Sequence, residues 1–345
     1  MPRLLPAVLL AIALAPGTFV RSQTPSDPPV DVALEQIAEA SAVQEPGWRV
    51  EGVWEYSAQH LLFGGFSALL AMNNHHLTAF SDRGARMRFV EPDRPQPKPR
   101  AGDRHNRARY VVRQLVDRKY ARELWDIESA TRDPATGAYW LGFENVHAFH
   151  RFTNASAADG VRIIDKEVDW SVNSGAEAMV RLADGRFLVI PESGGQALLY
   201  PRDPIAGDAP ETLTYISPQK GFGITDVKQM PDGRLLILLR SVVWGIPPFE
   251  ARIAIADLPG ADEPQELAPR FVLDLTRAVP PENYEGLAFR DRGDGTLDVW
   301  IISDDNRALM QRTLLAKLVL DPKALCKADK VAPAGSDETH QKARD

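Results

Sequence analysis

One unit recurs five times along this chain and constrains its fold more than any other feature. Each copy begins with an acidic or small polar residue, passes through an apolar stretch to a tight turn, and returns through a second apolar stretch. In the clearest copy, 177–192 (EAMVRLADGRFLVIPE), the apolar segments flank Asp184-Gly185. Asp-Gly between apolar segments is a strong hairpin signal. The unit therefore predicts two antiparallel strands, with Glu177 and Glu192 at the same end.

The other four copies follow the same pattern with different turns. They are residues 67–82 (SALLAMNNHHLTAFSD), 128–144 (ESATRDPATGAYWLGFE), 226–240 (DVKQMPDGRLLILLR) and 285–304 (EGLAFRDRGDGTLDVWIISD). A hairpin repeat of about 40–60 residues is typical of a β-propeller, in which each blade is a four-stranded sheet. We therefore predict an all-β propeller with five four-stranded blades. Six blades and a non-repeating β-sandwich are the alternatives.

The two ends of this region are predicted to pair with each other. Trp48, Val50, Trp54 and Tyr56 alternate with mainly polar residues, and residues 314–320 alternate as well. Alternation of this kind indicates strands. We predict that the N-terminal strand completes the last blade and closes the ring, which removes exposed sheet edges.

The N-terminal residues 1–22 have the pattern of a secretory signal peptide. Arg3 provides the positive charge, and the apolar stretch 4–15 is too short to span a bilayer. A membrane anchor is the alternative. We expect the mature protein to be periplasmic or secreted and to have no integral membrane segment.

The rest of the chain is divided by composition. We assign residues 23–46 to a polar leader, within which 31–42 could form a short helix, and 47–320 to the propeller. The polar residues 321–345 are predicted to be disordered. Cys326 is the only cysteine, so no intrachain disulfide can form, and the fold must depend on a large core. The net charge of −7 argues against nucleic acid as a partner.

The repeated polar positions predict an acidic site. If the first strand of each blade lines the central channel, one mouth receives Ser67, Glu128, Glu177, Asp226 and Glu285. The residues that close the second strands form a layer beside them: Asp82, Glu144, Glu192, Arg240 and Asp304. Two carboxylates about 6 Å apart repel by roughly 3 kcal/mol at an effective dielectric near 20. Such a ring must take up protons, pair with arginines, or bind a cation.

Oxygen ligands without a cluster of cysteine or histidine favour a hard ion. We predict calcium, with magnesium as the alternative, bound by Asp82, Glu144, Glu192, Asp226 and Asp304. We predict catalytic roles for Glu177, Glu128 and Glu285, with Glu177 as general base toward water that attacks a phosphate or acyl ester. We predict substrate contacts for Arg83, Arg240 and His147. A guanidinium group suits phosphate or carboxylate, although Arg240 could equally form a structural ion pair.

Other catalytic motifs do not occur in the sequence. There is no Gly-x-Ser-x-Gly nucleophile motif, no phosphate-binding glycine loop and no zinc-ligand spacing.

Four short segments resemble the esterase-like phytase family, a group of exported bacterial proteins. They are YEGLAF at 284–289, GGFSAL at 64–69, SDRG at 81–84 and GAEA at 175–178, and the resemblance spans roughly residues 48–320. It implies hydrolysis of a small-molecule phosphate or carboxylic ester, and similarity to β-propeller phytases implies calcium. Two alternatives remain: a non-catalytic propeller that binds a ligand or protein at the same mouth, and a calcium-dependent lactone hydrolase.

Overall fold

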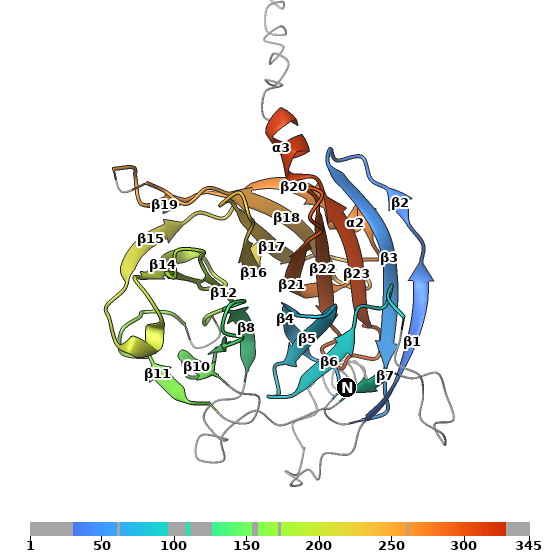
Figure 1. Ribbon diagram of the computed structural model, residues 1–345, viewed down its shortest axis with the longest axis horizontal. Helices are drawn as coiled ribbons and strands as arrows, with labels where there is room; N and C mark the ends of the chain where they lie inside the picture. The colour runs from blue at the N-terminus through green and yellow to red at the C-terminus, as the bar shows by residue number, and fades with distance from the viewer. Residues whose placement is uncertain are drawn as a thin grey trace, which may run out of the picture.

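The computed structural model describes residues 30–60, 63–95, 108–110, 126–153, 158–171, 174–260 and 262–328. Its strands form five sheets arranged around a common centre, and its helical segments are short (Figure 1). The prediction of an all-β, five-bladed propeller is confirmed. The predicted signal peptide, 1–22, lies outside the described residues.

The blades follow one another along the chain. Blade 1 contains β4 (Phe66–Met72), β5 (His76–Ser81) and β6 (Arg86–Val90). Blade 2 contains β8 (Ile127–Arg132), β9 (Tyr139–Phe143), β10 (Ala148–Phe152) and β11 (Gly160–Ile163). Blade 3 contains β12 (Ala178–Arg181), β13 (Phe187–Ile190), β14 (Gly195–Tyr200), β15 (Glu211–Tyr215) and the short β19 (Glu266–Leu267), and the 3-10 helix η1 (Pro204–Ala206) lies between β14 and β15.

The last two blades contain the longest strands. Blade 4 contains β16 (Gly223–Gln229), β17 (Leu235–Val242), β18 (Phe249–Ala256) and β20 (Arg270–Asp274), followed by the helix α2 (Leu275–Ala278). Blade 5 contains β21 (Asn283–Asp291), β22 (Leu297–Asp304) and β23 (Thr313–Leu320), then β3 (Trp48–Ser57), β1 (Val30–Ala38) and β7 (Ala108–Tyr110), with β2 (Ser41–Ala42) also on β3. The helix α3 (Pro322–Ala328) follows β23.

The first strands of the blades form the inner ring. Each contacts the next, in the order β4, β8, β12, β16 and β21, and β21 contacts β4. Hydroxyl groups join neighbours: Ser67 Oγ donates to the carbonyl of Ile127, and Thr225 Oγ1 donates to the carbonyl of Tyr284 at 3.5 Å. These hydrogen bonds connect neighbouring first strands around the ring.

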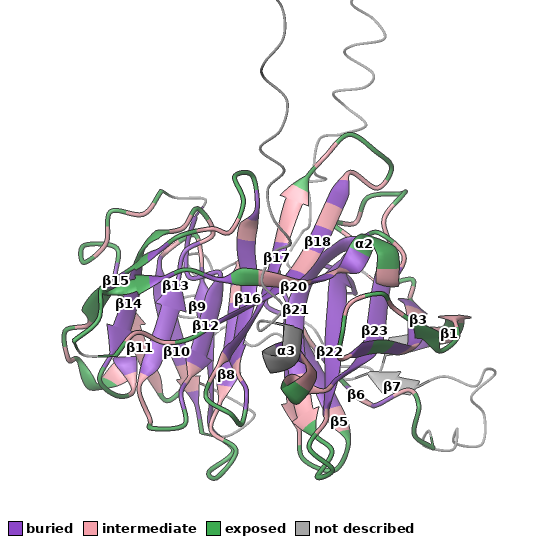
Figure 2. Ribbon diagram, turned by 90° about the horizontal axis from the view of Figure 1, so that it is seen from above, coloured by how far each residue is buried: buried purple, intermediate pink, exposed green. Residues whose placement is uncertain are grey.

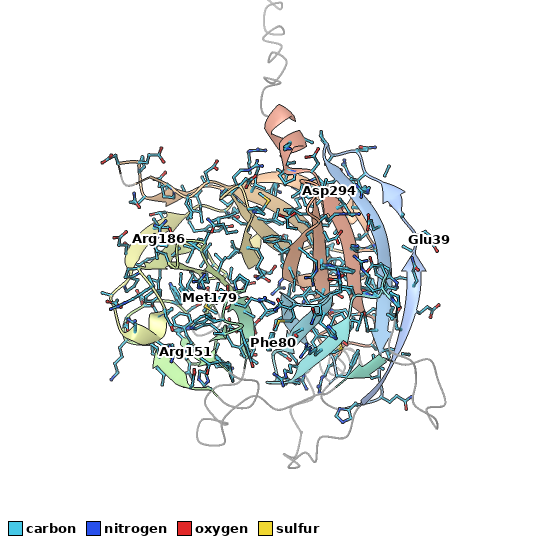
Figure 3. All side chains as sticks on the ribbon, viewed as in Figure 1. Glu39, Phe80, Arg151, Met179, Arg186 and Asp294 are labelled. Atoms are coloured by element: carbon cyan, nitrogen blue, oxygen red, sulfur yellow. The ribbon has the colours of Figure 1, made fainter. Side chains whose placement is uncertain are left out.

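Five apolar clusters fill the five interfaces between neighbouring blades. At the interface of blades 2 and 3, for example, the rings of Trp140 and Phe187 pack edge to face with centroids 4.9 Å apart. Both faces of a blade are therefore covered, and every residue of β22 is buried. Figure 3 shows Phe80 and Met179 among the packed strands and Glu39 at the outer edge. This burial explains why the strands appear in the sequence as apolar runs rather than strict alternation.

The Asp-Gly turns form as the sequence predicts. In blade 3 the amide of Arg186 donates to Asp184 Oδ1 at 3.0 Å, and Gly185 has a φ of +92°. The pairing of Ala178 with Ile190 places Glu177 and Glu192 at the same end of this hairpin. We call the face where first strands begin and second strands end the mouth face.

The N-terminal strand β3 pairs with the C-terminal strand β23, from Trp48 opposite Leu320 to Tyr56 opposite Thr313. Blade 5 then extends beyond four strands. The interpretation of 31–42 as a helix is wrong, because β1 pairs with β3 from Ala33–Ser57 onward. The apolar residues of this stretch fit a strand because the edge of β3 is available to pair with it.

Within the described residues blade 1 has three strands, and Ala108–Tyr110 pairs with β1. One expectation about the C-terminus needs correction. Within the predicted disordered tail, residues 322–328 form α3, because Leu325 is buried in the apolar cluster of blades 4 and 5. Of the helices in the described part of the chain, none is both long and apolar enough to cross a bilayer.

Candidate functional site

A β-bulge recurs at the start of the inner strands. The register with the second strand shifts at Ser67 in blade 1, Glu128 in blade 2, Thr225 in blade 4 and Glu285 in blade 5. A bulge leaves one residue out of the ladder and turns its side chain away from the sheet. The repeated bulge therefore sets which side chains reach the mouth face, and Glu177, just before β12, occupies the corresponding place in blade 3.

Three half-buried carboxylates of blade 2 form a group that can hold a metal ion. One oxygen each from Asp126, Glu128 and Glu144 lies within 4.8 Å of the other two. Calcium binds oxygens at about 2.4 Å, so two of its ligands lie at most about 4.8 Å apart. The donor set is hard and anionic, as calcium requires. We call these three residues the acidic triad.

The acidic triad is held in place by neighbouring amides. Asn145 Nδ2 donates to Asp126 Oδ2 at 2.7 Å, and the amide of Gly175 lies 3.5 Å from Glu144 Oε1. Asp126 has a φ of +81°, which is uncommon for a residue other than glycine. Its backbone carbonyl accepts from the amide of Glu144 at 3.0 Å, which joins the two ends of the β8–β9 hairpin.

Arg240 occupies the other side of the site. Its Nη2 lies 3.3 Å from Glu192 Oε1 and its Nε lies 3.4 Å from Glu285 Oε1. Glu285 also accepts from Asn283 Nδ2 at 2.8 Å. The guanidinium group thus joins acids from blades 3 and 5, while the acidic triad has no such cation within hydrogen-bond reach among the described residues.

The carboxylates influence one another strongly. Burial, followed by the charge of Asp82, raises the pKa of Asp126 to about 6, and burial, followed by the charge of Asp126, raises the pKa of Glu144 to about 7. Burial, with Glu192 and Glu144 next, raises the pKa of Glu177 well above its ordinary value. Burial and Glu177 do the same for the pKa of Glu128. The raised pKa values favour proton uptake by these carboxyl groups, and a bound cation would favour their charged forms instead.

Blades 1 and 5 supply further acids at the mouth face. Asp304 is buried, and its pKa is raised well above the ordinary value by burial, then by Glu285 and Asp82. Asp305 accepts from the amide of Gly65 at 3.1 Å. Gly65 has a φ of +68°, and a Cβ there would lie 2.2 Å from Asp82 Oδ1. Only glycine fits this position, which accounts for the glycines in the motif at 64–69.

Asp226 does not join the cluster. Its carboxylate is fully buried and accepts from Lys228 Nζ, from the amide of Val227 at 2.7 Å and from the amide of Leu287 at 2.8 Å. The bulge in β16 falls at Thr225, so the side chain one residue later points elsewhere. Asp226 therefore lies outside the acidic triad, in contacts that join blades 4 and 5, and its role as a metal ligand stays a prediction.

Two predicted substrate contacts differ in their surroundings. Arg83 is partly exposed, with Nε 3.7 Å from Asp82 Oδ2. His147 is buried, and its ring packs against the edge of Trp170 with centroids 5.6 Å apart. Its Nδ1 has no hydrogen-bond partner within the described residues. Arg83 therefore lies beside Asp82 at the site, whereas the His147 imidazole packs against the ring of Trp170.

Sequence reasoning did not select two residues that the structure places in the site. Asp126 lies two residues before Glu128, and this second acidic residue at the start of the strand was the available signal. Arg307 interacts electrostatically with Asp82, Asp305 and Asp304. It lies three residues beyond Asp304 in a loop, and no periodic pattern marks it.

The raised pKa values predict how stability depends on pH. Between the ordinary value for Glu of 4.5 and about 7, the folded protein keeps protons on Glu144 that the unfolded chain releases. Unfolding then releases protons, so these groups stabilise the fold below pH 4.5 and lose that contribution as the pH rises through 7. We expect the melting temperature in EDTA to fall from pH 5 to pH 7.5. Glu144→Gln should make the decrease shallower, and an equal slope in both proteins would contradict this account.

These features define the class of protein: a five-bladed β-propeller with a carboxylate-rich site on the mouth face. The sequence matches the family described as Phytase-like, esterase-like activity of phytase, over residues 61–307. The match covers more than half of the chain, so the chain belongs to this family, as its short motifs predicted. A comparison with the curated proteins finds no match.

Several solved structures have a similar arrangement of strands. A luciferin-regenerating enzyme is 10% identical, with a TM-score of 0.45, 79% of this chain covered and 95% of the other. An exo-1,5-alpha-L-arabinanase from a bovine ruminal metagenomic library is 10% identical, with a TM-score of 0.45 and coverages of 76% and 95%. The PQQ-bound aldose sugar dehydrogenase from Streptomyces coelicolor is 11% identical, with a TM-score of 0.42 and coverages of 84% and 99%. Similarity at this level carries no information on the activity of this chain.

Proposed function

We propose that the protein is an exported hydrolase of phosphate or carboxylic esters that acts at the mouth face with a bound calcium ion. The observation that carries this proposal is the acidic triad, with its oxygens within 4.8 Å, on the same face as an arginine held between two carboxylates. Membership of the family described by its esterase-like activity supports the reaction class. The signal-like residues 1–22 support export.

Each part of the site has a chemical task in this proposal. Asp126, Glu128 and Glu144 would hold the ion, which supplies positive charge that polarises the substrate's ester oxygen. Arg240 offers donors to an anionic oxygen of the substrate. Glu177 interacts electrostatically with Glu144 and Arg240, and we assign it as the base that accepts a proton from the attacking water, with the bound ion favouring its charged form.

The assignments differ in part from the sequence predictions. Glu144 remains a proposed metal ligand, and Glu128 moves from a catalytic role to the same group. Glu192 and Glu285 both lie against Arg240, so we propose that they orient the guanidinium group. Asp82 interacts electrostatically with Arg83 and Arg307, and Asp304 interacts with Arg307. In this proposal the two acids offset the positive charge of the arginines in the site.

The reaction class is tested with substrates that share one leaving group. Purified protein without residues 1–22 is incubated with p-nitrophenyl acetate and p-nitrophenyl phosphate, and separately with a simple lactone, in EDTA and then in excess calcium. Calcium-dependent turnover of one nitrophenyl ester supports the proposal and identifies the ester class. Turnover of the lactone alone would favour the lactone hydrolase. No turnover of any of them would favour a non-catalytic propeller.

Calcium binding is expected to stabilise the fold even without substrate. A ligand that binds only the folded state, at about 100 times its dissociation constant, adds roughly 2.7 kcal/mol to the free energy of unfolding. We expect a rise in melting temperature of about 5 °C on replacing EDTA with calcium. Asp126→Asn combined with Glu128→Gln should abolish the rise. An unchanged melting temperature with calcium and with magnesium would remove the ion from the proposal.

A further inference from the structure

Apolar exposure on this molecule is concentrated on a few side chains. Within the described residues, the exposed large hydrophobic side chains are Ile163, Ile216, Val242, Trp244, Ile246, Leu309 and Met310. Trp244 and Leu309 are fully exposed, at 105% and 101%, whereas Ile163 and Ile216 are only about half exposed, at 46% and 44%. Single exposed apolar residues are ordinary on a protein surface, so only their grouping on one face would indicate an interaction site.

All seven lie at the mouth face. Trp244 and Ile246 are in the loop that follows β17, four and six residues beyond Arg240. Leu309 and Met310 are in the loop that follows Asp304 at the end of β22. Ile163 pairs with Ala148, which begins the strand after the Glu144 turn.

The remaining isoleucine follows the same geometry. Ile216 comes directly after Tyr215, which pairs with Gly195. Gly195 begins the strand after Glu192, so this position is also at the mouth end of blade 3. Apolar side chains thus surround the carboxylate cluster on four of the five blades.

The opposite face has a different character. Its turns join the first and second strands of each blade, and they carry polar residues paired with each other. Arg186 Nε donates to Asp184 Oδ2 at 2.8 Å, and Arg234 Nη2 donates to Asp232 Oδ2 at 2.7 Å. None of the exposed large hydrophobic side chains in the described chain lies on these turns. The exposed large hydrophobic side chains of the described residues therefore all lie on the mouth face.

The tip that carries Trp244 is held out from the body. β17 and β18 remain paired up to Val242 opposite Phe249, and the amide of Val243 donates to the carbonyl of Pro248 at 2.9 Å. Phe249 is buried, with the Arg240 guanidinium 5.9 Å from its ring centroid. Figure 2 shows this hairpin projecting beyond the neighbouring strands. The hairpin thus presents Trp244 and Ile246 to the surroundings instead of folding them onto the body.

We propose that the mouth face docks on a zwitterionic phospholipid surface, with Trp244, Ile246 and Leu309 inserted among the lipids. A protein partner with a flat surface would require a continuous apolar patch. Here the apolar side chains stand on separate loops around a charged centre, and each of them can insert into a lipid layer. Tryptophan is enriched where lipid meets water. The formal net charge of −7 disfavours approach to anionic headgroups, so the surface we expect is a neutral one. This inference does not depend on the proposed hydrolysis.

The test measures binding without catalysis. Full-length mature protein is sedimented with phosphatidylcholine vesicles in EDTA, and with vesicles that also contain phosphatidylglycerol. We expect binding to phosphatidylcholine, a blue shift of tryptophan emission, and weaker binding as the phosphatidylglycerol content rises. Trp244→Ser should weaken binding by about 10- to 100-fold, as expected for one large apolar side chain. Trp244→Leu is the matched control and should retain most of the binding.

A second loop and the fold are checked separately. Leu309→Ser should weaken binding as well, because it acts from another blade, and the melting temperatures of all variants should match that of the parent since these side chains are exposed. Absence of sedimentation with phosphatidylcholine would overturn the proposal. Binding only to anionic vesicles, or equal binding by Trp244→Ser and the parent protein, would also overturn it.

Discussion

Replacing Glu177 with glutamine is expected to lower ester turnover by about 10²- to 10⁴-fold, the usual contribution of a general base. The side chain is buried, and its pKa is raised by burial and by the nearby Glu192 and Glu144. A carboxylate in such surroundings is more basic than one in water, and the cation of the proposed site would favour the charged form that accepts a proton from water. Glutamine has the same shape and lacks this ability.

The same substitution is expected to leave the protein as stable as before or slightly more stable. It removes one charge from a site where Glu128, Glu144 and Glu192 repel it, so the fold loses a source of repulsion. Turnover of the active p-nitrophenyl ester and the melting temperature in EDTA are measured together. Glu211→Gln, an exposed position on β15, is the control. Unchanged turnover with an intact fold would remove Glu177 from the catalytic role.

Lys228→Met is expected to destabilise the protein by about 3–5 kcal/mol, the usual cost of removing one partner from a buried ion pair. Lys228 and Asp226 are both buried, and the Lys228 Nζ also donates to the carbonyl of Ala130 at 3.3 Å. This contact joins blade 4 to blade 2 at the centre of the ring. Without the lysine, the Asp226 carboxylate keeps only the amides of Val227 and Leu287.

The double variant separates charge from packing. Asp226→Asn together with Lys228→Met removes both charges, so it should be less destabilised than the sum of the two single variants. Urea unfolding at pH 8 measures all four proteins. The loss in Lys228→Met should be smaller at pH 5, because the unpaired carboxyl can then take up a proton. A loss below about 1 kcal/mol for the single variant would show that the pair is not important for stability.

The propeller fold follows from local signals that repeat. Asp184-Gly185 and Asp232-Gly233 each form the predicted turn, and five copies of one hairpin unit cannot bury their apolar residues except by packing against each other. The strand β1 was missed because its partner, β3, is a sheet edge that only the folded blade provides. The same holds for α3, whose Leu325 is fixed by burial against blades 4 and 5.

The candidate site divides in the same way. The positions of Glu177 and Glu192 at one end of a hairpin could be predicted from the sequence, since two-residue periodicity and a tight turn fix that end. The acidic character of the mouth face could be predicted as well. The pairing of the strands in the folded blades was needed to show that the bulge of blade 4 falls at Thr225 rather than at Asp226, and that Asp126 completes the acidic triad. A bulge changes which face a side chain takes, and this depends on the pairing of two strands rather than on either sequence alone.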